Sequence, residues 1–180
     1  MMKATGIVRR IDDLGRVVIP KEIRRTMRIR EGDPLEIFTS REGEVIFKKY
    51  SLVGGLEEFA AQFCDTLAHS TDFTVAIADR DSIIAVAGSG KRELLGKSIS
   101  RSLEEMMDNR AIYQRSAESQ TFPVSESAPE FSVAVAAPIL CQGDVLGQVL
   151  FLTNQDRVAG EAEYKLAQTV AAFLGKNMES

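Results

Sequence analysis

The chain has 180 residues, of which 44% are hydrophobic and 27% are charged, and its formal net charge is −4. This composition is typical of a soluble globular protein and excludes a largely disordered chain. No segment approaches the roughly 20 apolar residues of a transmembrane helix, and the first residues lack the apolar stretch of a signal peptide, so we expect a cytoplasmic protein with no membrane partner.

The charge is divided unevenly along the chain. Residues 1–50 hold 12 Lys and Arg against 8 Asp and Glu, a net charge of +4, whereas residues 51–180 hold 10 against 18, a net charge of −8. Such asymmetry indicates a nucleic-acid-binding segment joined to a domain of another kind.

The first 50 residues predict the element order β-β-α-β-β. Apolar and basic residues alternate over 6–11, turn residues follow at 12–15, and a β-branched run at 17–19 ends at Pro20, which suits the first position of a helix over 20–27. Two further strands are predicted at 35–39 and 44–49, around a hairpin turn in which Gly43 supplies a positive φ.

This N-terminal segment is too small to fold alone. Four short strands and a two-turn helix seldom bury enough apolar surface for independent stability. We therefore expect an interleaved dimer, in which each chain completes the sheet of the other.

The adjacent glycines Gly54 and Gly55 predict a linker over residues 51–55, and a second domain over 56–180. Its hydrophobic periodicity predicts a helix from residue 56 to about 70, a strand pair at 73–78 and 82–87, and a helical stretch ending near 107. A clear hairpin at 131–140 and 145–153 and a final helix over 160–178 complete an α+β domain, while residues 116–130 give no legible pattern.

Basic side chains are the strongest functional candidates. Arginine forms planar, bidentate hydrogen bonds with phosphate oxygens or with the edge of guanine, so a short basic segment doubled by dimerisation favours double-stranded DNA as the partner. The alternative is a solvated basic face without a ligand. The arginines concerned are Arg9, Arg10, Arg16, Arg24 and Arg25.

The run from Lys3 to Arg25 closely resembles the AbrB-type swapped-hairpin DNA-binding domain of bacterial transition-state regulators. The order and length of the remaining elements resemble, less strongly, members of that group that carry a C-terminal GAF-like domain. The resemblance implies that two chains swap hairpins into one β-barrel, an intertwined dimer, on AT-rich or loosely conserved DNA sites. It also implies control of sporulation or developmental genes, as activator or repressor, in the nucleoid of the forespore.

Residue by residue, the resemblance places Arg9, Arg16, Arg24 and Arg25 on the DNA face, with Arg10 as a basic neighbour. Nearby basic residues lie outside the clear motif and are either auxiliary phosphate contacts or solvated side chains. These residues are Lys21, Arg28 and Arg30.

The C-terminal half contains no motif that supports an enzyme. Residues 88–91 lack the spacing of a phosphate-binding loop, and His69, near a predicted helix end, suits a cap or a surface position. Asp79 and Asp81 suit a turn better than a metal pair, and the separated Cys64 and Cys141 suit small core residues better than a zinc site. We expect neither a metal nor a cofactor.

The sequence leaves three alternative functions open. The first is a homo-oligomeric transcription regulator, whose C-terminal helices could pack across a two-fold axis and whose GAF-like domain could respond to a small-molecule effector. The second is a swapped-hairpin antitoxin, although such antitoxins usually end in a short disordered tail. The third is a small-molecule-sensing GAF-like protein with secondary DNA contact. The choice between dimer and tetramer stays open.

Overall fold

The structure is a computed structural model that describes residues 6–50 and 57–178. The chain divides into two units, Met1–Tyr50 and Ser51–Ser180. The linker predicted at 51–55 lies outside the described residues.

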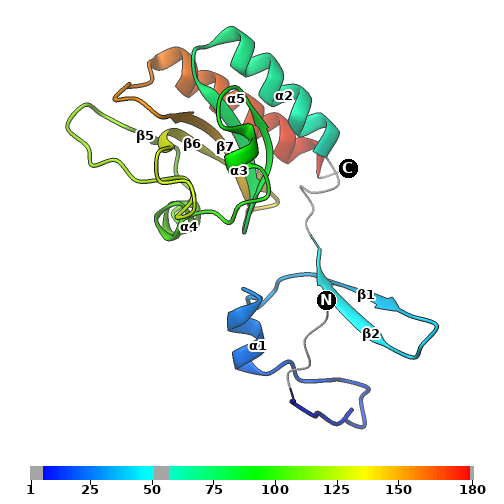
Figure 1. Cartoon of the computed structure of the whole chain (residues 1–180). Helices are drawn as coiled ribbons and strands as arrows, with labels where there is room; N and C mark the ends of the chain where they lie inside the picture. The colour runs from blue at the N-terminus through cyan, green and yellow to red at the C-terminus, as the bar shows by residue number, and fades with distance from the viewer. Residues whose placement is uncertain (1–5, 51–56, 179–180) are drawn as a thin grey trace. The chain divides into compact units, whose positions relative to one another are not determined.

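The N-terminal unit contains one helix and one hairpin (Figure 1). Helix α1 spans Lys21–Thr26 directly after Pro20, and strands β1 (Leu35–Thr39) and β2 (Val45–Lys49) pair antiparallel. At the hairpin turn the amide of Gly43 donates to Ser40 O at 3.2 Å, and φ of Gly43 is 84°. The helix, the second hairpin and the conformation of its glycine are as predicted.

The strands predicted at 6–11 and 17–19 are wrong for the single chain, in which both segments are irregular. The turn between them does form, because the Gly15 amide donates to Asp12 O and the Asp12 amide to Arg16 O, both at 3.0 Å. An isolated two-stranded hairpin has little stability without a surface to pack on. The described residues of one chain accordingly form no closed barrel.

The described residues of the N-terminal unit, 6–50, form no hydrophobic core of their own. Among its described residues only Pro20 is buried, while Ile23 of α1 is half-buried and Met27, which follows the helix, is exposed. Further large apolar side chains of this unit are between 37% and 88% exposed. They are Ile7, Val8, Ile11, Leu14, Val17, Val18, Ile37, Phe38, Val45, Phe47 and Tyr50.

The C-terminal unit is built on a five-stranded antiparallel sheet of order β4-β3-β7-β6-β5 (Figure 1). The strands are β3 (Thr74–Asp79), β4 (Ile83–Ala87), β5 (Tyr113–Gln114), β6 (Ser132–Cys141) and β7 (Asp144–Thr153). The helices are α2 (Glu57–Ser70), α3 (Lys91–Leu94), α4 (Arg101–Asp108) and α5 (Glu161–Asn177).

Apolar side chains cover both faces of this sheet. Helices α2 and α5 pack on one face through residues such as Leu67 and Leu174, around Phe151. Helices α3 and α4 cover the other face with Leu94 and Leu103. The predicted α+β domain is confirmed, with the helical stretch before residue 107 divided in two. Residues 116–130, whose sequence pattern predicted no helix or strand, form a loop over the second face, in which Val124 and Ala128 are buried.

Candidate nucleic-acid interface

All six predicted DNA-binding residues are exposed, and they come from three neighbouring stretches of the N-terminal unit. Arg9 and Arg10 lie in the irregular segment before the first turn, and Arg16 follows that turn. Lys21, Arg24 and Arg25 belong to α1. Exposure leaves each cation available to an anionic partner.

A dense set of hydrogen bonds fixes the turn that carries Arg16. Asp12 Oδ1 accepts from the amides of Leu14 at 3.0 Å and Arg16 at 2.8 Å, and Asp12 Oδ2 accepts from Arg16 Nε at 2.8 Å. The amide and then the guanidinium of Arg16 hold the pKa of Asp12 below its ordinary value, so the carboxylate stays charged. Because the contact uses Nε of a well-exposed side chain, Arg16 is oriented by the turn while it still faces solvent.

Helix α1 gathers its cations on one side. Lys21 is three residues before Arg24 and four before Arg25, a spacing that places side chains over the same helix face. Arg24 and Arg25 also lie in the last turn, where the helix dipole favours positive charge. The half-buried Ile23 lies on another side of the helix.

The corner after α1 is held by residues that the sequence analysis did not single out. Lys49 Nζ donates to Arg28 O at 2.8 Å and lies 3.6 Å from Asp33 Oδ2, which also accepts the amide of Arg30 at 2.8 Å. Arg28 itself has a left-handed φ of 52°. Its side chain is exposed whereas that of Arg30 is half-buried. The ion pair of Lys49 and Asp33 therefore holds the corner that follows α1, and only a contact between distant residues could show this.

The candidates of the C-terminal unit have local structural roles. His69 Nδ1 lies 2.7 Å from Asp65 O at the end of α2, and Asp79 Oδ1 accepts the amides of Asp81 and Ser82 in the turn after β3. Within the described ranges, no group of three or more His, Cys, Asp or Glu side chains could hold a metal ion. No helix among the same residues is long and apolar enough to cross a membrane.

Two family models match the chain. Residues 55–179 match the family described as stage V sporulation protein T C-terminal, transcription factor. Residues 8–52 match the family described as antidote-toxin recognition MazE, bacterial antitoxin.

Curated relatives cover both units. The chain is 51% identical to stage V sporulation protein T of Bacillus subtilis (strain 168) over 178 residues, which cover 99% of each chain. It is 61% identical to the transition state regulatory protein AbrB of the same organism over 49 residues, 27% of this chain and 50% of that protein. The resemblance of the N-terminal motif to the AbrB type is confirmed.

Among solved structures, the fold resembles a type II free methionine-R-sulfoxide reductase from Thermoplasma acidophilum, with a TM-score of 0.52 and 13% identity over 68% of this chain and 94% of that one. GAF domains are among the other similar structures. Identity over almost the whole length decides the assignment. The chain therefore belongs to the stage V sporulation protein T family of transcription factors.

Proposed function

We propose that two copies of this chain bind double-stranded DNA through the basic residues of their N-terminal units and thereby regulate sporulation genes. One observation carries the proposal: a unit without a core of its own presents arginines from a structured turn and from one helix face. The DNA-contacting side chains are Arg9, Arg10, Arg16, Lys21, Arg24 and Arg25.

Dimerisation follows from the exposed apolar side chains. Residues 6–11 alternate like a strand but are irregular in the single chain, and Val8 and Ile11 are exposed. A second copy that supplies the missing strands would bury these side chains and close the swapped-hairpin barrel. It would also double the number of cations on the DNA face.

Salt dependence measures the electrostatic part of binding. A dimer that neutralises about eight phosphates releases counterions, so log K should fall with log salt concentration at a slope near −7. Titrations by fluorescence anisotropy between about 50 and 200 mM salt would give this slope. An affinity that is indifferent to salt would contradict the proposed arginine contacts.

Substitutions separate DNA contact from folding. Arg16→Ala and Arg24→Ala should each weaken DNA binding by about tenfold or more, because one bidentate contact is worth roughly 1–3 kcal/mol. The melting temperature should barely change, since both side chains are exposed. Arg41→Ala, in the turn of the other hairpin, is the matched control and should bind DNA as the unchanged protein does. Equal losses in all three variants would contradict a defined DNA face.

The C-terminal unit is proposed to set assembly and response to a signal, without enzymatic activity. Phe59 of α2 and Phe173 of α5 are exposed on helices that share one face of the sheet, and Phe173 packs against Phe63 with ring centroids 5.4 Å apart. These aromatic side chains suit a helical interface between copies, as a dimer or a tetramer. A small-molecule effector of this unit, and action in the cytoplasm on the forespore nucleoid, belong to the same proposal.

The antitoxin match over residues 8–52 makes binding of a toxin protein the second candidate. The C-terminal unit favours the regulator, because it is a folded domain with two apolar cores rather than a short tail. Genome-wide mapping of DNA occupancy decides between them. A regulator should occupy many promoters, whereas an antitoxin should be confined to its own operon.

A further inference from the structure

A pocket of about 430 Å³ opens in the C-terminal unit, where strands β3 and β7 meet the end of α2. Asp72 and Phe73 line it from the α2–β3 connection, and Ser89 lines it from the segment after β4. Gln155 and Arg157 line it from the connection between β7 and α5. Three segments that are separated in sequence thus form one concave site.

Two opposite charges face each other in this pocket. Arg157 Nη2 lies 3.2 Å from Asp72 Oδ2, and Arg157 Nη1 lies 3.4 Å from Asp72 O. The guanidinium carbon lies 4.6 Å from the centroid of the Phe73 ring, which holds the planar group against an aromatic face. The side chains are 43% and 84% exposed, so the pair contributes little to stability and a ligand can replace it at small cost.

The walls beside this pair are polar but already hydrogen-bonded. Thr74 Oγ1 lies 2.8 Å from Ser89 Oγ, and Thr153 Oγ1 accepts the amide of Gln155 at 3.1 Å. Both threonines are buried, so these bonds hold the pocket in shape. Specific recognition is left mainly to the two charged side chains.

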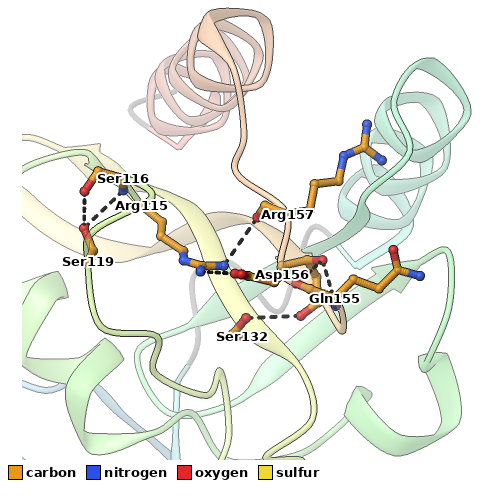
Figure 2. Close-up of polar contacts among 8 residues, drawn as sticks. Arg115, Ser116, Ser119, Ser132, Gln155, Asp156 and Arg157 are labelled. Atoms are coloured by element: carbon orange, nitrogen blue, oxygen red, sulfur yellow. Dashed lines mark hydrogen bonds and ion pairs between the residues drawn. The ribbon is translucent and has the colours of Figure 1, made fainter.

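Asp156 and Arg115 hold Arg157 in place from the other side (Figure 2). The guanidinium of Arg115 is buried, pairs with the Asp156 carboxylate and donates from Nη1 to Arg157 O at 3.5 Å. Figure 2 shows the Arg157 side chain pointing away from this contact. The same connection is tied to β5, because Gln114 Nε2 donates to Ala159 O at 2.8 Å. Arg157 is therefore presented from an anchored segment that leads directly into α5.

We propose that this pocket binds a zwitterionic α-amino acid. The ligand's carboxylate replaces that of Asp72 on the Arg157 guanidinium, and its ammonium group binds the Asp72 carboxylate. The two opposite charges lie 3.2 Å apart, so an anion alone would use only the charge of Arg157, and a cation alone would use only that of Asp72. A zwitterion uses both charges, while the half-buried Ala68 offers apolar surface to its side chain. The inference rests on the proposed effector response and names its site and chemical class.

Binding to the full-length protein without DNA tests this proposal. Each of the twenty L-amino acids is titrated by calorimetry, with propionate as the carboxylate-only probe and propylamine as the ammonium-only probe. At least one amino acid should bind once per chain, and both single-charge probes should bind about tenfold more weakly or worse. If no amino acid binds, or if propionate binds as tightly, the proposal is overturned.

Substitutions then locate the site. Asp72→Asn and Arg157→Gln should each weaken amino-acid binding by about tenfold or more. Arg101→Gln, which removes an exposed ion pair with Glu105 on α4, should leave it unchanged. Unchanged binding in both pocket variants would overturn the assignment. This readout involves no DNA, so its failure leaves the proposed DNA contacts standing, and loss of the salt-dependent DNA binding would leave this site standing.

Discussion

Substituting Gly175 by alanine sets helix propensity against packing. Gly175 is buried in the last turns of α5, where glycine is about 0.5–1 kcal/mol less favourable than alanine. Propensity alone therefore predicts that Gly175→Ala stabilises the C-terminal unit. A Cβ at this position, however, would lie 2.1 Å from Leu140 O and 3.1 Å from Leu140 C.

Packing decides whether Gly175→Ala stabilises or destabilises the C-terminal unit. The obstacle is backbone of β6 rather than the tip of a flexible side chain, so α5 and β6 must separate by roughly 1 Å to relieve the contact. Forcing an extra carbon into a packed core costs typically 1–3 kcal/mol, and a rigid obstacle places this site near 3 kcal/mol. After the propensity gain, we expect a net loss of about 2 kcal/mol, or roughly 6–8 °C in Tm for a unit of this size.

Differential scanning calorimetry and urea unfolding of the full chain would measure this change. Gly160→Ala, at the other end of α5, is the control. There the nearest atom to a new Cβ is Glu163 Oε2, a mobile carboxylate oxygen at 3.3 Å, so the loss should stay below about 1 kcal/mol. A Gly175→Ala protein as stable as the original, or more stable, would refute the close contact between α5 and β6.

Three further predictions follow from single residues. Burial raises the pKa of the Cys64 thiol to about 12, so iodoacetamide at pH 9 should modify the partly exposed Cys141 before Cys64. The neutral Cys64 thiol contributes its full stability below about pH 9, and this contribution is lost as the pH rises through 12. Gln148 is fully buried, and its amide has no hydrogen-bond partner among the described residues, so Gln148→Met should raise stability by about 1–2 kcal/mol in urea unfolding. Asp12→Ala should weaken DNA binding in anisotropy titrations, but less than Arg16→Ala, because it removes only the orientation of that side chain.

Local patterns predict the C-terminal unit well where pairing is local. The alternation over 131–140 and 145–153, joined through Gly143, corresponds closely to β6 and β7, whose ladder runs from Ser132 and Thr153 to the turn. Similarly, apolar residues spaced by three and four give α2 and α5 nearly at the expected bounds. Such elements carry the information for their own structure in consecutive residues.

Tertiary contacts account for what the sequence did not reveal. Strand β5 has two residues and exists only because Tyr113 and Gln114 pair with Ala136 and Val135 of β6. The ion pair of Arg115 and Asp156 joins residues 41 positions apart. The pocket likewise forms only where three segments meet, and no periodicity within any one of them predicts this.

For the candidate DNA interface, residue type and motif predicted the arginines but not what orients them. The spacing of Asp12 and Arg16 across a glycine-containing turn is itself enough to indicate an aspartate turn and an ion pair. The contact of Lys49 with Arg28 O could not be predicted from local sequence, because it joins residues 21 positions apart. Short-range positioning could thus be predicted here, and long-range positioning could not.

The wrong strand predictions at 6–11 and 17–19 themselves argue for a partner. An alternating apolar pattern stabilises a strand only when one face is covered, and in a single chain Val8, Ile11 and Val18 are all exposed. The arginines interleaved with them would then be positioned by dimerisation rather than by the fold of one chain. Any change in how the C-terminal units associate would consequently alter the effective concentration of N-terminal units, and with it DNA affinity, without moving a single DNA-contacting residue.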